Sequence, residues 1–436
     1  MSDEPRHAPG AGPNRGAANQ VDELLEKAGA VKRASRVLAL ASTDTKNRAL
    51  EVIARTLRAH ESVILAANEH DCLQAAAGRV DLDRLRLNHD RLQTMARDVE
   101  AVAGLPDPVG EEFDRVVRPN GLVVSKRRVP LGVVGVVYEA RPNVTSDIAA
   151  LCLKTGNAVL LRGGREAIGS NAAIAGAIRE ALVEAGLPGD GVHLIESVDR
   201  GLVERMLRLR EYIDVIIPRG GEGLIRFTIE HATVPVIETG AGVCHTYVDR
   251  AADPGMALRI VYNAKVRRPT ICNALDTVLV HRDVASSWLP QLAAAWSKVP
   301  VEMRADPEAA GILRAAGASC TAAGGDDWGR EFLSLVAAVK VVGGLDEALD
   351  HIQRYGSGHS EAIVTADRAA ACRFLDEVDA AAVYVNASTQ FTDGGEFGLG
   401  AEVGISTQKL HARGPMGLRE LTTYKWVIEG TGQTRA

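Results

Sequence analysis

The stretch that decides the fold reads VVGVVYEARPNVTSDIAALCLKTGNAVLLRGGR and covers residues 133–165. Apolar runs stand near both ends, at Val133–Tyr138 and Ala158–Leu161, and a helical segment begins between them at Ser146. Two short apolar strands joined by a helix are typical of parallel strands in a sheet that helices cover on both faces. This stretch therefore predicts an α/β fold.

The alternation continues towards the C-terminus and divides into two series. In the first series we expect further strands at Val192–Ile195, Ile213–Ile217 and Val234–Glu238, with helices at Ser170–Ala185, at Arg200–Leu209 and after Gly223. In the second series we expect strands at Leu275–Val280, Val339–Val342, Glu361–Val364 and Ala382–Asn386, with helices between them. The sequence thus predicts two doubly wound α/β domains. We expect a cofactor-binding domain at 21–255, a catalytic domain at 256–408, and a C-terminal oligomerisation and return segment at 409–436.

Two N-terminal regions stand outside this alternation. Residues 1–20 are rich in Gly, Pro, Ala and Asn and contain no apolar run, so we expect a disordered leader and no secretory signal. Helices are expected at Val21–Ala41, from Ser42 or Thr43 to about Ala77, and at Asp90–Val102.

Residues 115–128 predict a hairpin inserted in the first domain. Apolar and charged residues alternate around Pro119-Asn120-Gly121, and Asn-Gly is a strong hairpin signal. A hairpin outside both sheets suits subunit pairing, which predicts a homo-oligomer; a plain surface ribbon is the alternative.

Composition excludes several classes of protein. The 436 residues carry a net charge of −6, without the basic patch that nucleic-acid binding needs. No apolar run approaches the roughly 20 residues of a membrane span. The six cysteines form no CxxC pair, so we expect neither a zinc site nor a disulfide framework, and a reducing, cytoplasmic location.

Three glycine-rich turns follow expected strands. They are Arg162-Gly163-Gly164-Arg165, Pro218-Arg219-Gly220-Gly221 and Glu238-Thr239-Gly240-Ala241-Gly242. Such turns let backbone N–H groups approach a phosphate, although none matches GxGxxG after the first strand. Ordinary turn chemistry explains any one of them; three at successive strand ends favour a phosphate-bearing cofactor.

Cys272 and Asn143 are the candidate catalytic residues. Cys272 follows Lys265, Arg267 and Arg268 in a segment that Pro269 keeps from being a regular helix, and nearby cations favour a thiolate. A small buried hydrophobe is the alternative for any cysteine. Asn143 follows a strand end, where its amide can donate to an oxyanion or simply form the turn.

Taken together, these segments resemble the aldehyde dehydrogenase superfamily, and within it the gamma-glutamyl phosphate reductase family. The resemblance runs from about Arg33 to Trp426 and is most specific in five blocks. These are 138–145 (YEARPNVT), 161–166 (LRGGRE), 218–221 (PRGG), 268–273 (RPTICN), and the C-terminal block from Asn386 to Gly417.

The resemblance implies an activity and a role for each matched residue. It implies NADPH-dependent reduction of L-glutamyl 5-phosphate to L-glutamate 5-semialdehyde through a cysteine thioester, in proline biosynthesis downstream of glutamate 5-kinase. Cys272 matches the catalytic cysteine and Asn143 the oxyanion asparagine. The cofactor-binding residues it implies are Arg162, Gly163, Gly164, Arg165, Pro218, Arg219, Gly220, Gly221, Glu238 and Gly240. No metal is expected.

Two of these roles, and two departures from the family pattern, bear on the chemistry. Arg165 stands where NAD-using relatives carry a Glu, and a cation there suits the 2′-phosphate of NADPH. Glu238 occupies the position of the superfamily's general base. At two positions the chain departs from the pattern: Arg267 replaces an expected Gln, and Gln390 replaces an expected Arg.

Substrate contacts are expected from Arg141, Arg267, Arg268, His411 and Arg413. Two other functions stay open, namely a hydrolytic NAD(P)-dependent aldehyde dehydrogenase and a non-catalytic binding protein on the same fold.

Overall fold

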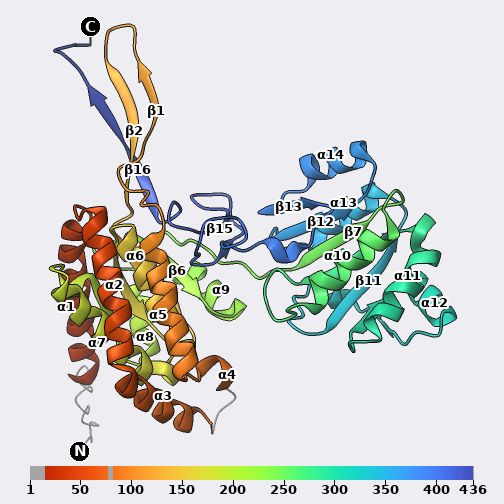
Figure 1. Ribbon diagram of the computed structural model, residues 1–436, viewed down its shortest axis with the longest axis horizontal. Coiled ribbons are helices and arrows are strands. Elements are labelled where there is room, and N and C mark those ends of the chain that lie inside the picture. The colour runs from red at the N-terminus through yellow and green to blue at the C-terminus, as the bar shows by residue number, and fades with distance from the viewer. Residues whose placement is uncertain (1–14, 77–81, 436) are drawn as a thin grey trace, which may run out of the picture. The chain divides into compact units, whose positions relative to one another are not determined.

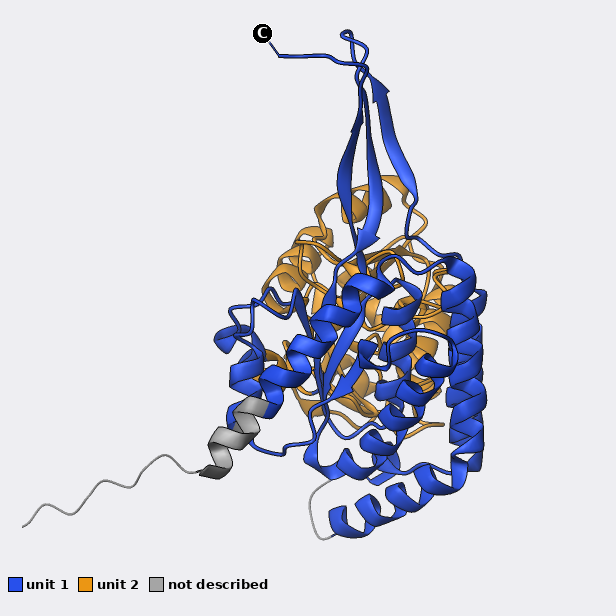
Figure 2. Cartoon of the chain, turned by 90° about the vertical axis from the view of Figure 1, so that its left-hand side faces the viewer, with its two compact units in different colours: residues 1–220, 226–236, 421–436 blue, residues 221–225, 237–420 orange. Residues whose placement is uncertain are grey.

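The computed structural model describes residues 15–76 and 82–435, which form two compact units. Unit 1 comprises residues 1–220, 226–236 and 421–436, and unit 2 comprises residues 221–225 and 237–420 (Figure 2). Among the described residues, no helix combines the length and the apolar character needed to cross a bilayer.

Unit 1 is built on a four-stranded parallel sheet in the order β5-β4-β3-β6. The strands are β3 (Val133–Tyr138), β4 (Ala158–Arg162), β5 (Val192–Leu194) and β6 (Val215–Arg219). All their residues are buried except the last residues of β4 and β6, because helices cover the sheet. The helices are α1 (Arg15–Leu38), α2 (Thr43–Ala59), α3 (Glu61–Ala75), α4 (Leu82–Leu85), α5 (His89–Gly104), α6 (Asn143–Lys154), α7 (Ile168–Glu184), α8 (Arg200–Met206) and α9 (Glu222–His231), the last of which begins within unit 2. The predicted α/β fold is confirmed.

Two local predictions for unit 1, a helix and a strand, are wrong. The helix expected from Ser42 to Ala77 ends at Ala59 and restarts at Glu61, because His60 has non-helical backbone angles (φ −92°, ψ 14°). Ser42 does cap α2, accepting a hydrogen bond from the N–H of Thr45. The strand expected at Val234–Glu238 is reduced to one isolated bridge between Ile216 and Val236, since Pro235 has no N–H to donate.

The disordered leader predicted at residues 1–20 falls only partly within the residues that the structure describes. Residues 1–14 lie outside the described residues. Residues 15–20 belong to α1, so a disordered leader reaching Gln20 is wrong for this part.

Unit 2 is built on a seven-stranded parallel sheet in the order β10-β9-β11-β8-β7-β12-β13. The strands are β7 (Cys244–Val248), β8 (Leu275–His281), β9 (Glu302–Ala305), β10 (Thr321–Ala322), β11 (Val336–Val342), β12 (Ser360–Val364) and β13 (Ala382–Val385). The helices are α10 (Pro254–Val266), α11 (Arg282–Trp296), α12 (Pro307–Ala315), α13 (Leu345–Tyr355) and α14 (Arg368–Glu377). A short two-stranded sheet, β14 (Ile405–Ser406) with β15 (Gly414–Pro415), completes it.

The boundary between the units differs from the expected join near residue 255. Strand β7, which we did not predict, lies between β8 and β12 in the second sheet, so the chain passes into unit 2 at Ile237. Residues 409–420 also belong to unit 2, and only 421–436 return to unit 1. Sheet pairing decides this boundary, because a strand belongs to whichever sheet satisfies its backbone groups.

The hairpin lies where we expected it and gains a third strand from the C-terminus. Strands β1 (Glu112–Val117) and β2 (Val123–Pro130) pair antiparallel, and Gly121 takes a positive φ of 85° in the turn. Strand β16 (Thr422–Glu429) pairs with the other edge of β2 along its whole length, and the three project together (Figure 1). One side chain, Asn157, ties this return segment to unit 1 by donating to the carbonyl of Leu421 at 2.8 Å.

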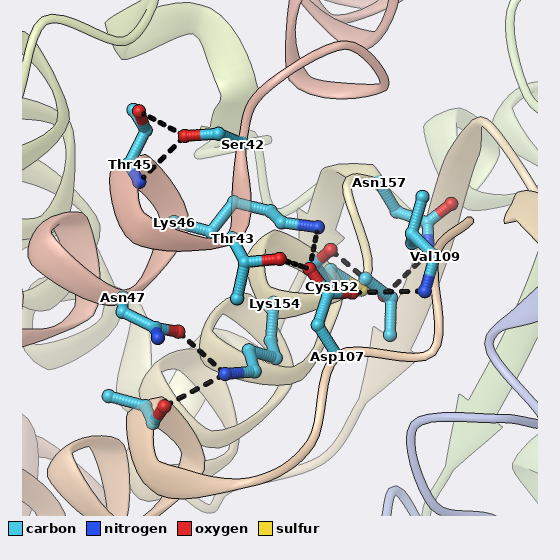
Figure 3. A network of polar contacts seen from close by, with 12 residues as sticks. Ser42, Thr43, Thr45, Lys46, Asn47, Asp107, Val109, Cys152, Lys154 and Asn157 are labelled. Carbon is cyan, nitrogen blue, oxygen red and sulfur yellow. Dashed lines mark hydrogen bonds and ion pairs between the residues drawn. The ribbon is translucent and has the colours of Figure 1, made fainter. Parts of the chain in front are cut away.

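A polar network in unit 1 surrounds the buried side chains of Lys46 and Lys154 (Figure 3). Lys46 Nζ lies 2.5 Å from Asp107 Oδ2, and both side chains are almost fully buried. Asp107 also accepts hydrogen bonds from Thr43 Oγ1 at 2.7 Å and from the Val109 N–H at 3.0 Å. Nearby, Lys154 Nζ donates to the carbonyl of Ala103 at 2.8 Å. The network therefore joins α2, α6 and the end of α5.

Candidate active site

Cys272 lies on the loop of residues 267–274, between the end of α10 and the start of β8. Asp253 caps the start of α10 by accepting from the Met256 N–H, and the helix ends at Val266, ahead of Pro269. Cys272 is partly exposed, whereas the residues from Asn273 into β8 are buried. The chain thus changes from helix to buried strand within eight residues and leaves the thiol near the surface of unit 2.

Hydrogen bonds from distant segments hold this loop. Asn273 is buried and its Nδ2 donates to the carbonyls of Gln390 at 3.3 Å and Thr392 at 2.9 Å. Thr389 Oγ1 donates back to the carbonyl of Asn273 at 2.7 Å. In the sequence, Asn273 is only the last residue of the motif 268–273; in the structure it anchors the C-terminal side of the Cys272 loop.

The turn of residues 238–242 packs directly against this loop. A Cβ on Gly242 would lie 1.6 Å from the carbonyl oxygen of Cys272, so only glycine fits there. A Cβ on Gly240 would lie 2.4 Å from Thr407 Oγ1. These glycines, expected at a cofactor phosphate, are therefore required by close packing within unit 2. Glu238 is partly buried in the same turn, and its N–H donates to Gln408 Oε1 at 2.9 Å.

A buried ion pair lies behind the loop. Lys265 Nζ donates to the carbonyl of Leu275 at 2.8 Å and lies 3.8 Å from Asp276 Oδ1. Burial raises the pKa of Asp276 to about 7 and lowers that of Lys265. Asp276 accepts hydrogen bonds from the N–H groups of Phe332 at 3.0 Å and Cys244 at 3.4 Å. Lys265, counted from sequence as a cation near the thiol, thus points into the protein interior.

The two departures from the family pattern contact each other. Arg267 Nη1 donates to Gln390 Oε1 at 3.3 Å, although 123 positions separate the two residues. Of the three cations expected to flank Cys272, therefore, Lys265 and Arg267 both have partners within unit 2. Arg268 is exposed.

Asn143 is the first residue of α6 in unit 1. The helix starts three residues earlier than expected, directly after Pro142. Asn143 Nδ2 donates to Asp147 Oδ2 at 2.9 Å, one helical turn further on. Burial raises the pKa of Asp147 to about 7. Sequence reasoning missed Asp147, although its i, i+4 spacing from Asn143 is visible in the sequence.

The glycine-rich turn after β4 presents two arginines with different surroundings. Arg162 Nη1 donates to the carbonyl of Gly163 at 2.9 Å and Nη2 to that of Val198 at 3.4 Å. Arg165 is exposed, and its side chain makes no hydrogen bond or ion pair with any residue that the structure describes. A Cβ on Gly163 would lie 2.2 Å from Asn171 Nδ2, so this turn is closely packed from behind. The exposed guanidinium of Arg165 is the group here that suits an anionic ligand.

The turn after β6 has the features of a phosphate-binding turn. Strand β6 contains Pro218 and Arg219, and α9 begins at Glu222 directly after Gly220 and Gly221. A Cβ on Gly223 would have no atom of the described residues within 4 Å, so there is room beside this residue, while the N–H groups of Leu224 and Ile225 both donate to the carbonyl of Gly221. The N–H groups and the dipole of a helix N-terminus attract anions. The turn thus combines two glycines with a helix N-terminus, the features on which the prediction of a phosphate site rests.

The residues expected at the substrate have mixed surroundings. His411 has a positive φ of 67°, and its Nε2 donates to the carbonyl of Glu420 at 2.6 Å. Arg413 Nη2 donates to Asp379 Oδ1 at 2.7 Å, so its charge is already paired. Arg141 is exposed and lies in the turn before α6.

Comparison with known proteins identifies the family. The aldehyde dehydrogenase family model matches residues 7–311. The chain is 56% identical over 418 residues to gamma-glutamyl phosphate reductase of Dehalococcoides mccartyi, covering 95% of this chain and 98% of that one. It belongs to the aldehyde dehydrogenase family, among the gamma-glutamyl phosphate reductases.

Other members of the family agree with this assignment. The gamma-glutamyl phosphate reductase of Roseiflexus castenholzii is 57% identical over 94% of this chain and 99% of its own length. The crystal structure of the Thermotoga maritima gamma-glutamyl phosphate reductase superposes with a TM-score of 0.93 at 50% identity, covering 95% of this chain and all of that chain. An acetylating aldehyde dehydrogenase from Geobacillus thermoglucosidasius, 18% identical with a TM-score of 0.68 over 96% of this chain and 99% of its own, shares the fold.

Proposed function

We propose that this protein reduces L-glutamyl 5-phosphate to L-glutamate 5-semialdehyde and phosphate, with NADPH and through a thioester on Cys272. The observation that carries the proposal is the partly exposed Cys272 on a loop held from both sides, in a chain 50–57% identical to several gamma-glutamyl phosphate reductases along nearly its whole length. The reaction belongs to proline biosynthesis and follows a glutamate 5-kinase, which would supply the labile acyl phosphate. We expect the protein to act in the cytoplasm.

The mechanism begins with the Cys272 thiolate attacking the acyl carbon of the substrate. Asn143 Nδ2 and the Cys272 N–H would donate to the oxyanion, and Asp147 would hold the Asn143 amide in place. Removing one such donor typically costs about 3–4 kcal/mol of transition-state stabilisation. Expulsion of phosphate leaves an acyl group on Cys272, so that two easier steps replace one difficult reduction.

The cofactor would be held by unit 1 and the turn before α9. The two glycines before α9 and the N-terminus of this helix suit the pyrophosphate, and the unpaired guanidinium of Arg165 suits the 2′-phosphate that distinguishes NADPH from NADH. When bound, NADPH supplies the hydride that takes the acyl group to the aldehyde level. Cys272 is then released as a thiolate.

The test is to measure NADP-dependent oxidation of glutamate semialdehyde with phosphate present and with phosphate absent. We expect activity only with phosphate, because phosphate must cleave the thioester in this direction. Equal activity without phosphate would indicate a hydrolytic aldehyde dehydrogenase. No activity in either condition, together with an inert Cys272 towards alkylation, would indicate a binding protein.

We further propose that β1, β2 and β16 pair subunits of a homo-oligomer. Val117, Trp426 and Ile428 on these strands are large apolar residues that are more than half exposed. Size-exclusion chromatography of a protein lacking residues 115–128 should then show monomers. A deletion protein that still elutes as an oligomer would overturn this assignment.

A further inference from the structure

Gln390 is a buried residue that forms hydrogen bonds at both ends of the Cys272 loop. Its side chain is 4% exposed and lies in the short 3-10 helix Thr389–Phe391, more than one hundred residues beyond Cys272. Its Nε2 donates to the carbonyl of Ala264 at 2.9 Å and to that of Arg268 at 3.5 Å. Its own backbone carbonyl accepts from Asn273 Nδ2 at 3.3 Å.

These hydrogen bonds supply a donor to a carbonyl that has no partner within α10. The last carbonyls of a helix have no partner within the helix, and leaving them buried without a donor is costly. Ala264 is in the last turn of α10 and is fully buried. Gln390 therefore supplies the donor that allows α10 to end there and the chain to turn towards Cys272.

At position 390 of this chain the side chain must both donate to carbonyls and accept from Arg267, which only an amide can do. Both N–H groups of Nε2 point at carbonyls, and Oε1 accepts from Arg267 Nη1 at 3.3 Å. A glutamate would face two carbonyls without a donor. An arginine would have donors enough but would face the guanidinium of Arg267. The two carbonyls on one side and the exposed Arg267 on the other thus together fix which way the buried amide points.

We propose that Gln390 is a positioning residue for Cys272, with Arg267 orienting its amide. The inference rests on the proposed function, in which Cys272 is the nucleophile. A nucleophile displaced by about 1 Å can lose on the order of a hundredfold in rate, so the effect belongs to the chemical step rather than to cofactor binding.

The first test compares Gln390→Met with the wild-type protein. Met has a similar length but neither donor nor acceptor. We expect kcat for phosphate-dependent semialdehyde oxidation to fall roughly ten- to a hundredfold, with KM for NADP changed by less than about threefold. The rate at which iodoacetamide labels Cys272 should fall with kcat. Unchanged kcat and labelling rate would overturn the proposal.

Thr365→Val is the matched control. Thr365 is buried in unit 2, donates to Asp249 Oδ2 at 2.7 Å and accepts from the Asp367 N–H at 2.9 Å, but none of its hydrogen bonds reaches the Cys272 loop. This variant loses comparable buried hydrogen bonds, so it should melt at a lower temperature with unchanged kcat and labelling rate. If it reproduces the losses of Gln390→Met, Gln390 is merely structural and the proposal fails.

The second test exchanges the two partners and remains informative if Gln390→Met does not fold. Gln390→Arg alone places two guanidinium groups together and should lose activity. In the double variant with Arg267→Gln, the arginine at position 390 can donate to the glutamine at position 267. We therefore expect kcat of the double variant to be about tenfold or more above that of Gln390→Arg. A double variant no better than the single one would overturn the pairing. Separately, a Cys272→Ser protein that stays active would refute the proposed function itself.

Discussion

Each unit of the molecule buries a lysine beside an aspartate, but the two pairs differ in geometry. In unit 1, Lys46 touches Asp107 at 2.5 Å, and the carboxylate accepts further bonds from Thr43 and Val109. In unit 2, Lys265 and Asp276 stand 3.8 Å apart, and the pKa of Asp276 is raised to about 7. The unit 1 pair joins helices, whereas the unit 2 pair lies behind the loop that carries Cys272. A lysine and an aspartate therefore hold structural elements together in unit 1, whereas in unit 2 they support a candidate catalytic loop.

The strongest test of a chemical role for unit 2 alone is Cys272→Ser. We expect no measurable turnover, because a serine hydroxyl is far less acidic than a thiol and no base within the loop activates it. NADPH affinity, assigned mainly to unit 1, should be unchanged in a fluorescence titration. A Ser variant that retained more than a few per cent of the wild-type rate would contradict the assignment.

Thiol labelling checks the same point. Iodoacetamide should label Cys272 before the buried Cys152 and Cys244, whose pKa values burial raises. Cys372 is exposed, so a Cys372→Ser protein is the control for non-specific labelling. Faster labelling of Cys244 or Cys152 would mean that the nucleophile is misassigned.

The two buried pairs should differ when their lysines are removed. Lys46→Met leaves Asp107 buried without its direct partner, and breaking such a pair typically costs about 3–5 kcal/mol. Lys265→Met should cost clearly less, since a carboxyl whose pKa is about 7 can take up a proton near neutral pH. Urea unfolding of both variants at pH 7 measures the difference. Equal losses would show that the two pairs are energetically alike.

The raised pKa of Asp276 also predicts a pH dependence of stability. Its pKa is about 7 when folded and 3.8 ordinarily, so its protonated form stabilises the fold below pH 3.8 and this contribution is lost as pH rises through 7. The stability of wild type relative to Asp276→Asn should therefore decrease from pH 4 to about pH 7, by at most about 1.4 kcal/mol per pH unit, and change little above that. Urea midpoints of both proteins at pH 5 and pH 8 provide the check. A difference that does not change with pH would contradict the shift.

For unit 1, we expect Arg165→Glu to alter cofactor choice. Exchanging a cation near the 2′-phosphate for a carboxylate should lower the ratio of NADPH to NADH activity by about tenfold or more. Because the exposed Arg165 has no partner among the described residues, the melting temperature should stay the same. An unchanged ratio would exclude Arg165 from the cofactor site.

The smallest effect is expected at Glu238, in the turn against the Cys272 loop. A thioester cleaved by phosphate needs no base to activate water, so Glu238→Gln should leave the phosphate-dependent rate mostly intact. General-base catalysis typically contributes about a hundredfold or more. A loss of that size in the steady-state rate would require Glu238 to be assigned a catalytic role.

Much of this protein was determined by local sequence. The βαβ stretch at 133–165, the hairpin turn at Asn120-Gly121 and the non-helical segment around Cys272 were all predictable. In each case the signal is a short-range one, such as alternation of apolar residues, a turn that needs a positive φ, or a proline. The family motifs extended these signals to the nature of the site.

Only the tertiary structure decided which distant segments meet. The third strand β16, the place of β7 in the second sheet and the packing of Gly242 against Cys272 had no local signature. The same holds for the Arg267–Gln390 contact, which appeared in the sequence as two unrelated departures. Local patterns encode backbone conformation and amphipathicity, whereas a hydrogen bond across 123 positions forms only when the whole sheet and its helices bring both partners together.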